Sequence, residues 1–251
     1  MLLIFSLRKL ALTFRNVNRL RRVVKNWYQI PLYHLGLKKT LIMHLNNGLS
    51  LLYIPDAFAI EHFLEEPYKM LEVKGRTVID VGAYSGDSAI FFSLKGATNV
   101  LAFEPFPFAY KIAQRNIELN KITNITLFNE AIGAEDGFVF VDSEAKGPST
   151  SLKQVGRTKV KMNSFSKLVK EMKLSHASLK LDCEGCEICL LNVDAKILNS
   201  FDQIILEYHD EGYVDLNDKL LSCGYKTMIY GANGSITGSP PTTNGLIYAR
   251  L

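Results

Sequence analysis

The sequence predicts an α/β fold in which helices cover both faces of a mostly parallel β-sheet. The first observation is a strand, glycine turn and helix over residues 77–94, where the apolar run of residues 78–81 ends at Gly82. The second is that short apolar runs and amphipathic helical segments then alternate along the rest of the chain. Repeated strand and helix units of this kind favour a parallel sheet that is wrapped on both faces.

Charge is distributed unevenly along the 251 residues. The formal net charge is +4, yet every charged side chain before Asp56 is basic, and the rest of the chain carries more acids than bases. No apolar run approaches the roughly 20 residues that span a bilayer. Residues 1–7 are apolar but precede the basic residues, unlike a secretory signal. We therefore expect a cytoplasmic protein, with a possible peripheral location at the inner membrane surface.

Residues 1–75 are expected to form a cap that precedes the sheet domain of residues 76–251. Asn47 and Gly48 separate two apolar runs and predict a β-hairpin over residues 40–54, because Asn-Gly readily adopts left-handed turn conformations. The cap therefore combines a hairpin with helical segments that come before and after it.

One of these helices is predicted over residues 10–27, where apolar residues recur at intervals of three and four. A second is predicted over residues 57–70. The first helix either packs on the domain with a solvated basic face or contacts an anionic membrane or anionic polymer through residues 8–27. Nucleic acid is the less favoured partner, because the sequence shows no matching basic patch elsewhere.

The sheet domain is divided into strands and helices by its apolar periodicity. Beyond the first strand, strands are expected at residues 99–103, 125–128, 137–141, 178–181, 203–207, 226–230 and 245–249. Helices are expected at residues 110–120, 164–173 and 214–223.

Glu104 follows the strand of residues 99–103, about 20 residues beyond Gly82, where an acid commonly binds the ribose hydroxyls of a nucleoside cofactor. The turn from Gly82 to Gly86 lacks the second glycine that admits a pyrophosphate in dinucleotide-binding proteins. Asp87 also disfavours an anion there. A nucleoside without phosphates fits better, and S-adenosylmethionine offers a ribose, an ammonium and a sulfonium to the carboxylates.

Three of the four cysteines follow the spacing C-x2-C-x2-C, at Cys183, Cys186 and Cys189. This is how a bacterial ferredoxin run begins, but Val193 stands where that run requires its next cysteine. A zinc site would also need a fourth ligand, and the remaining cysteine, Cys223, is distant in sequence. We expect small buried apolar side chains rather than a metal site or a disulfide framework, which agrees with a reducing compartment.

Several sequence elements resemble the FkbM-type family of S-adenosylmethionine-dependent methyltransferases. They are residues 78–87, 102–105, 129–133, 180–187 and 205–209. The order Asp-x-Glu-Gly-x-Glu at residues 182–187 is the most specific of them. The resemblance implies a seven-stranded Rossmann-like class I methyltransferase fold. It also implies S-adenosylmethionine-dependent O-methylation of a hydroxyl on a sugar, a glycan or another small-molecule acceptor.

The resemblance also implies roles for individual residues. The methionine end of the cofactor would be lined by Asp80, Gly82, Ala83 and Ser85, with Tyr84, Gly86 and Asp87 in the same turn. The ribose would lie at Glu104 and Pro105, and the adenine at Glu130 and Ala131. Asp182 would lie beside the amino group or the transferring methyl. Tyr84 stands where the family usually has Asn. Asp80 can instead fix the turn, and Glu187 is equally consistent with a solvated acid on the following helix.

A hydroxyl acceptor has to lose its proton, so a base is expected near the methyl group. His209 is the leading candidate, because an unperturbed imidazole titrates near about 6.5. Asp182 and Glu184 are alternatives, as the base or as ligands for a divalent ion that orients the acceptor. Three other functions stay open: a nucleic-acid methyltransferase that uses the basic N-terminal arm, a non-catalytic glycan- or membrane-associated binding protein, and an NAD-dependent oxidoreductase. The sequence gives no oligomeric state.

Overall fold

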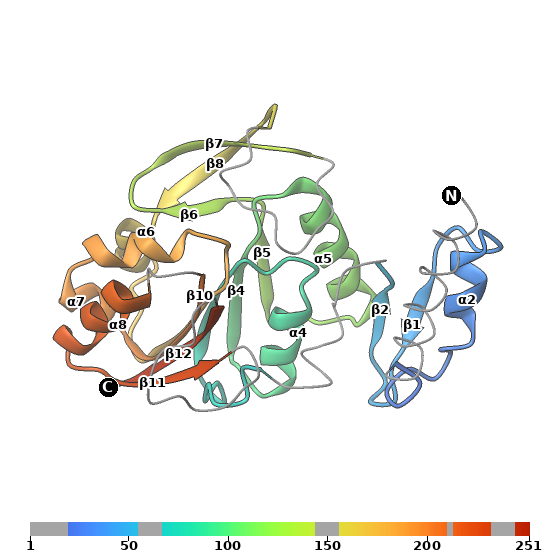
Figure 1. Ribbon diagram of the computed structural model, residues 1–251, viewed down its shortest axis with the longest axis horizontal. Coiled ribbons are helices and arrows are strands. Elements are labelled where there is room, and N and C mark those ends of the chain that lie inside the picture. The colour runs from blue at the N-terminus through green and yellow to red at the C-terminus, as the bar shows by residue number, and fades with distance from the viewer. Residues whose placement is uncertain (1–19, 55–66, 144–155, 210–212, 232–243) are drawn as a thin grey trace.

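The computed structural model describes residues 20–54, 67–143, 156–209, 213–231 and 244–251, and a seven-stranded sheet forms its centre (Figure 1). The strand order is β11-β12-β10-β9-β3-β4-β5. These strands are β3 (Thr77–Val81), β4 (Asn99–Phe103), β5 (Ile125–Phe128), β9 (Ala177–Leu181), β10 (Phe201–His209), β11 (Lys226–Gly231) and β12 (Asn244–Arg250). The strands from β5 to β10 pair in parallel, whereas β12 is antiparallel to β10 and to β11. The predicted mostly parallel sheet, with an antiparallel pair at its end, is confirmed.

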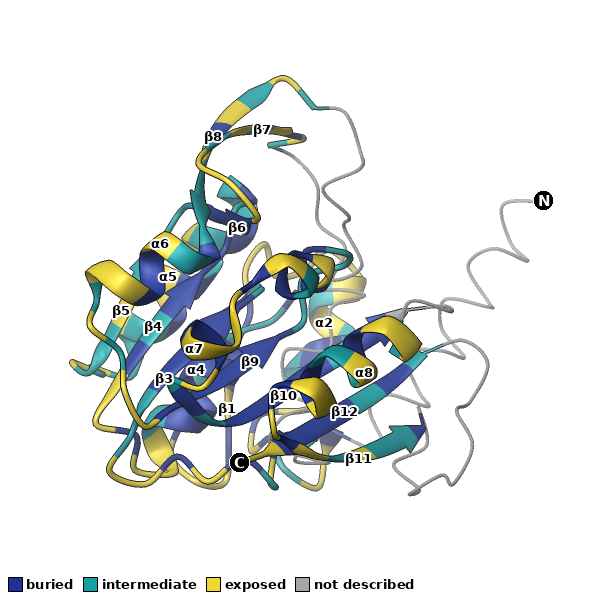
Figure 2. Ribbon diagram, turned by 90° about the vertical axis from the view of Figure 1, so that its left-hand side faces the viewer, coloured by how far each residue is buried: buried dark blue, intermediate teal, exposed yellow. Residues whose placement is uncertain are grey.

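Helices lie on both faces of this sheet, and the strands between them are largely buried (Figure 2). They are α4 (Asp87–Leu94), α5 (Pro107–Leu119), α6 (Phe165–Glu171), the 3-10 helix η1 (Glu187–Asn192), α7 (Ala195–Leu198) and α8 (Tyr213–Ser222). Phe92 of α4 packs on the face that carries Val78, while Phe165 of α6 packs on the opposite face with Ile79. Neighbouring residues of one strand therefore contribute to two separate cores, as side-chain alternation along a strand requires.

The small N-terminal unit, residues 20–54, contains α2 (Gln29–His34), β1 (Ile42–His44) and β2 (Ser50–Leu52). The predicted hairpin is confirmed, because β1 and β2 pair antiparallel and Gly48 takes a left-handed φ of 94°. The N-terminal unit is attached to α5 by the amides of Asn116 and Asn120, whose Oδ1 atoms accept from the backbone N–H groups of Leu52 and Ser50 at 2.8 Å.

The helix predicted over residues 10–27 is wrong for the part that the structure describes. Residues 21–28 form turns, and Val24 makes an isolated bridge to Leu45. The Lys25 N–H donates to His44 O at 2.7 Å, and the Asn26 Nδ2 donates to Ile42 O at 2.8 Å. Pairing with the hairpin thus uses backbone groups that a continuous helix would need. Residues 10–19 of that helix, and residues 57–66 of the second predicted helix, lie outside the described residues, and residues 67–70 form turns.

A second, three-stranded sheet has the order β6-β8-β7 and consists of β6 (Ala131–Gly133), β7 (Gly137–Val141) and β8 (Thr158–Ser164). The strand predicted at residues 137–141 is confirmed, but its antiparallel partner β8 was not predicted. β6 follows β5 almost at once, so this sheet starts at the carboxyl edge of the large sheet (Figure 1). Among the described residues, no helix is long and apolar enough to cross a membrane.

Candidate active site

The glycine turn after β3 brings two strand ends into backbone contact. Gly82 has a φ of +80°, and a Cβ built on it would lie 1.8 Å from the backbone oxygen of Asp182. The Asp182 N–H donates to Val81 O at 3.1 Å. Only glycine permits this approach, since any side chain would collide with the backbone that follows β9. The turn therefore positions Asp182 beside the predicted cofactor loop.

Tyr84, inside this turn, also adopts a left-handed backbone, with a φ of 44°. Asn tolerates that conformation better than an aromatic residue does, which gives a physical reason for the usual Asn at this position of the family. Ser85 and Asp87 follow and are both buried, and the Ser85 hydroxyl donates to Asp87 Oδ1 at 2.7 Å. Ala83 is buried, and Gly86 packs closely on α5 at Ala113.

Glu104 lies at the tip of β4 and is buried. Its Oε2 accepts from the Tyr84 N–H and its Oε1 from the Phe106 N–H, both at 2.8 Å. Burial raises the pKa of Glu104 to about 7, although the two backbone hydrogen bonds oppose this. Each oxygen keeps acceptor capacity beyond its one backbone donor. The carbonyl of Pro105 accepts from Asn129 at 3.1 Å, which ties this corner to the end of β5.

Asp80 is fully buried and ion-paired with Lys180, whose Nζ lies 3.0 Å from Asp80 Oδ1. Ser88 Oγ donates to the other Asp80 oxygen at 2.6 Å, and Lys180 Nζ donates to Gly82 O at 2.7 Å. Burial by itself would lower the pKa of Lys180, but the charges of Asp80 and Asp182 raise it overall. Asp80 therefore fixes the glycine turn through a charged Lys180.

Carboxyl groups from two neighbouring strand ends meet at Asp182 and Glu207. Burial, the Asp182 charge and a hydrogen bond with Asp182 raise the pKa of Glu207 to about 9, and the charge of Glu184 adds to the rise. The Tyr68 hydroxyl donates to Asp182 Oδ2 at 2.8 Å. Burial and the neighbouring Asp182 thus favour the protonated form of Glu207 at neutral pH, beside the Asp182 oxygen that accepts from Tyr68.

The loop from Cys183 to Glu187 differs from expectation. Cys183 and Cys186 form a disulfide, with their Cα atoms 5.5 Å apart, so the prediction that all the cysteines are unpaired apolar side chains is wrong for these two. Their spacing closes a tight loop that brings the two thiols together. Cys189 is free and buried, as predicted, and Cys223 is also free and buried.

Glu187 is not a surface acid but is buried. Its carboxylate accepts from the backbone N–H groups of Cys183 and Gly185, both at 2.8 Å. Burial raises the pKa of Glu187 in spite of these donors. The second acid of the Asp-x-Glu-Gly-x-Glu element, Glu184, has a left-handed φ of 56°. Through these two hydrogen bonds, Glu187, the last acid of the element, fixes the loop that contains Glu184.

Glu130 turns toward the small sheet. Its oxygens accept from Lys161 Nζ at 3.2 Å and from Asn163 Nδ2 at 2.5 Å, both on β8. Ala131 is buried in β6. The predicted adenine contact of Glu130 stays a prediction.

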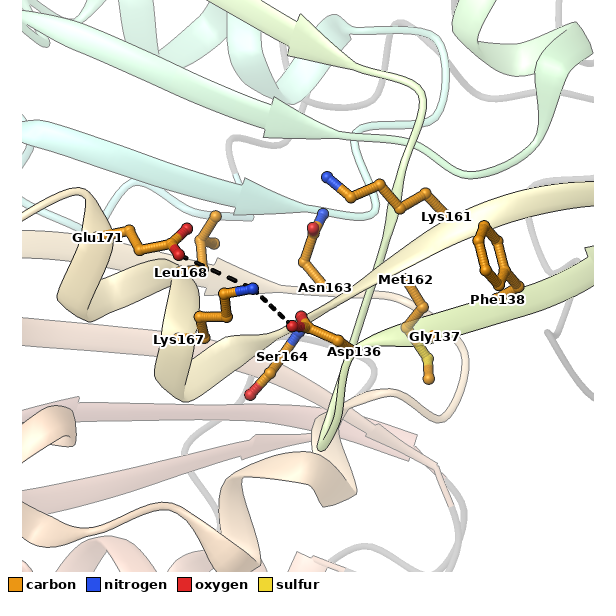
Figure 3. Close-up of a pocket in the computed structure, with 10 residues that line it drawn as sticks. All are labelled: Asp136, Gly137, Phe138, Lys161, Met162, Asn163, Ser164, Lys167, Leu168 and Glu171. Atoms are coloured by element: carbon orange, nitrogen blue, oxygen red, sulfur yellow. Dashed lines mark hydrogen bonds and ion pairs between the residues drawn. The ribbon is translucent and has the colours of Figure 1, made fainter.

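On the same sheet, a hollow of about 390 Å³ opens between β7, β8 and α6, and Lys167 in it pairs with Asp136 at 2.7 Å (Figure 3).

The structure adds three residues that the sequence did not assign to the site: Tyr68, Lys180 and Glu207. A signal existed for two of them, since Lys180 precedes Asp182 by two residues and Glu207 ends a predicted strand with a charged group. His209 is the last residue of β10 and pairs in register with Asn244, but its side chain lies outside the described part of the chain, so its role as base stays a prediction. Among the described residues, no group of His, Cys, Asp and Glu side chains is arranged to hold a metal ion.

Comparison with known proteins places this arrangement in a family. The family model described as the methyltransferase FkbM domain matches residues 80–227, which hold the glycine turn, Glu104 and the Asp182 loop. An uncharacterized protein, 158B, of Sulfolobus islandicus rod-shaped virus 1 is 30% identical over 159 residues, which cover 62% of this chain and 76% of that protein.

Solved structures share the fold. Methyltransferase FkbM from Methylobacillus flagellatus KT is 15% identical with a TM-score of 0.50; the match covers 76% of this chain and 52% of that one, about half its length. M. jannaschii TYW2, solved in complex with AdoMet, is 14% identical with a TM-score of 0.48, over 85% of this chain and 88% of that one. The large sheet is accordingly that of the Rossmann-like class I methyltransferases, and on its family match the chain belongs to the methyltransferase FkbM domain family.

Proposed function

We propose that this protein transfers a methyl group from S-adenosylmethionine to a hydroxyl of a sugar, a glycan or another small-molecule acceptor. The observation that carries the proposal is the carboxyl pair of Asp182 and Glu207, which Tyr68 holds beside the glycine turn. Membership of a methyltransferase family supplies the reaction class. The carboxyl pair supplies the group that removes a proton from a neutral acceptor.

The charges and hydrogen-bonding groups at this edge fit the proposed cofactor. Glu104, Asp182 and Glu207 are carboxyl groups, and burial raises the pKa of Glu104 and Glu207. Among the described residues, Lys180 is the one Lys or Arg side chain that is buried, and Asp80 already pairs with it. A ligand with an ammonium and a sulfonium would therefore compensate an excess of carboxylates, and the spare acceptor capacity of Glu104 suits ribose hydroxyls.

The residues of the site would divide the work as follows. S-adenosylmethionine, when bound, supplies a methyl group on a positively charged sulfur. The backbone of the turn from Gly82 to Gly86 and the carboxylate of Glu104 would bind and orient the nucleoside. Orientation of the reacting groups contributes on the order of 7–11 kcal/mol in the best intramolecular models, so a rigid turn matters for rate. Lys180 keeps that turn rigid through Asp80 and the Gly82 carbonyl.

The acceptor proton would pass to the carboxyl pair. A positive ligand beside Asp182 lowers the pKa of its partner Glu207, and the pair then becomes fully ionised and able to accept a proton from a hydroxyl. His209, the leading candidate from the sequence, is the competing base, and Glu184 is an alternative base or a ligand for a divalent ion. The variants Glu207→Gln and His209→Ala distinguish them: loss of turnover in one, with S-adenosylmethionine binding retained, identifies the base.

Calorimetric binding of S-adenosylmethionine, S-adenosylhomocysteine and NAD tests the cofactor. We expect the first two to bind, and Glu104→Ala to weaken both by about tenfold or more, since a hydrogen bond to a charged group contributes about 1.5–3 kcal/mol. Glu118→Ala, on the exposed side of α5, is the matched control and should bind as the wild type does. Binding of NAD in preference, or of neither methyl-donor compound, would overturn the proposal.

Once binding is established, transfer of a labelled methyl group to a panel of monosaccharides, oligosaccharides and single-stranded RNA tests the acceptor class. We expect a product on a saccharide hydroxyl. Methylated RNA without methylated saccharide would replace this acceptor class with nucleic acid.

A further inference from the structure

The outer side of the N-terminal unit exposes a cluster of large apolar side chains. Tyr28 is 57% exposed, Leu35 64% and Leu37 72%, and Trp27 and Leu32 are exposed beside them. We call these five residues the α2 surface. Single exposed apolar residues are common, but so many within one short segment indicate a surface that contacts something.

The packing of α2 explains why this side faces outward. Ile30 is buried against the hairpin, and the ring of Tyr33 packs edge-on against Tyr53 at 5.4 Å. Tyr28, Leu32 and Leu35 recur at intervals of four and three and so share the opposite side of the helix. Figure 1 shows α2 on the far side of the hairpin from α5 and the catalytic domain. The α2 surface is therefore directed away from the large sheet and its helices.

Basic side chains belong to the same N-terminal unit as the α2 surface. All of the lysines and arginines of the N-terminal unit are exposed: Arg21, Arg22, Lys25, Lys38 and Lys39. The sequence holds no acid from residue 1 to residue 55. The described part of this segment thus combines exposed apolar area with exposed basic side chains.

We propose that the α2 surface binds peripherally to a lipid bilayer that carries anionic headgroups. Leu32, Leu35 and Leu37 would enter the boundary of the acyl chains. The amphipathic rings of Trp27 and Tyr28 suit the headgroup level. Each basic side chain near an anionic membrane surface strengthens binding by about fivefold. The proposal does not depend on methyl transfer.

Two other occupants fit the observations less well. Single-stranded nucleic acid binds by stacking its bases on aromatic rings, and the three leucines that make up most of this surface offer no such rings. A second copy of the chain, related by a two-fold axis, would bring the basic side chains of the two N-terminal units together, and like charges would repel. An anionic lipid surface offers apolar chains to the leucines and negative charge to the lysines and arginines.

Trp27 is the one tryptophan in the sequence, so its fluorescence reports on this surface in the unmodified full chain. The probes are vesicles of phosphatidylcholine alone and of phosphatidylcholine mixed with phosphatidylglycerol. We expect a blue shift and co-sedimentation with the mixed vesicles, weakened by high salt, and little of either with phosphatidylcholine alone.

Two paired variants test the residues. The double variant Leu35→Ser/Leu37→Ser should weaken vesicle binding by about tenfold or more. Lys25→Gln/Lys39→Gln should weaken it by roughly 25-fold, about fivefold for each charge. Leu94→Ser/Leu221→Ser and Lys111→Gln/Lys226→Gln change equally exposed residues outside the N-terminal unit and should leave binding unchanged. Circular dichroism and S-adenosylmethionine binding establish that each variant is folded.

Several results would overturn the proposal. They are equal binding to both kinds of vesicle, no binding to either, or vesicle binding that the Leu35→Ser/Leu37→Ser variant retains in full. Binding of single-stranded RNA without vesicle binding would assign the basic side chains of the N-terminal unit to nucleic acid. A dimer in sedimentation that the leucine variant dissociates, without vesicle binding, would assign the α2 surface to contact between copies.

Discussion

The Tyr68 hydroxyl reaches across 114 residues of sequence to donate a 2.8 Å hydrogen bond to Asp182 Oδ2. Tyr68 belongs to the segment before the first strand of the sheet, and its ring packs near Phe92 and 5.6 Å from Lys180 Nζ. Burial and the charge of Asp182 raise the pKa of Tyr68 well above its ordinary value, so it stays a donor at any working pH. The segment before the sheet thus orients Asp182, a member of the candidate catalytic carboxyl pair.

Replacing Tyr68 by Phe keeps the ring but removes this donor. We expect methyl transfer to fall by about tenfold, because Asp182 loses one of the groups that fix its orientation, while S-adenosylmethionine binding changes little. Steady-state kinetics with an acceptor from the saccharide panel measures this. Tyr225→Phe is the matched control: Tyr225 is buried on the other face of the sheet and donates to Phe201 O at 2.7 Å, so its loss should lower stability only. Equal losses of activity in both variants would contradict a specific role for Tyr68.

Binding of S-adenosylmethionine should release a proton. The pKa of Glu207 is raised to about 9 by burial and Asp182, so Glu207 enters binding protonated at pH 7 to 8, and a positive ligand lowers that pKa. Calorimetry in buffers with different ionisation enthalpies measures the number of protons released. We expect Glu207→Gln to abolish the release and S-adenosylhomocysteine, which lacks the sulfonium, to cause less. A binding enthalpy that is independent of the buffer would show that Glu207 does not sense the ligand.

Stability should fall as the pH rises toward 9. The folded-state pKa of Glu207, about 9, exceeds its ordinary value of 4.5, so the stability that this proton contributes is complete below about pH 4.5 and is lost as the pH rises to 9. Glu104, with a pKa of about 7, adds to the decline over the lower part of this range. Urea unfolding at stepped pH should give a flatter profile for Glu207→Gln than for wild type or Glu118→Gln. A profile unchanged by Glu207→Gln would contradict the assignment.

Gly82→Ala should prevent stable folding of the catalytic edge. The added Cβ would lie 1.8 Å from the backbone oxygen of Asp182, and φ is +80°. We expect a loss of about 3 kcal/mol or more in the free energy of unfolding, from overpacking plus backbone strain. Gly48→Ala has a similar φ of +94° but nothing within 4 Å, so it should cost only the backbone strain, about 1–2 kcal/mol. Urea denaturation of both variants checks the difference, which would vanish if the close approach to Asp182 did not exist.

Reduction should destabilise the loop that follows Asp182. The Cys183–Cys186 bridge closes a short loop, which the chain-entropy model values at about 2 kcal/mol. Alkylation of the unfolded, unreduced protein should modify Cys189 and Cys223 but spare the bridged pair. Thermal melting should then give a lower Tm for the reduced wild-type protein than for the oxidised one. The Cys183→Ser/Cys186→Ser variant should have this lower Tm both with and without reductant. Modification of every cysteine without reduction would contradict the bridge.

The sequence by itself determined the strands that make up the large sheet. Residues 99–103 and 125–128 form strands with the predicted bounds, since a short apolar run between turn residues has few alternatives in a buried parallel sheet. It also determined the glycine turn and the place of Glu104 at the tip of β4, because a positive φ and a strand-tip acid leave local signs in the sequence. The hairpin at Gly48 was readable for the same reason.

The tertiary structure decided the pairings and charge states that depend on residues distant in sequence. Residues 21–28 have a helical apolar pattern, yet they bridge to the hairpin, because pairing with a neighbouring strand satisfies the same backbone groups. Lys180 and Glu207 stand out in the sequence only as charged residues of predicted strands, and the register of β9 beside β3 and β10 places them against Asp80 and Asp182. Burial then sets their charge states, since desolvation and neighbouring charges depend on what packs around a group rather than on the group itself.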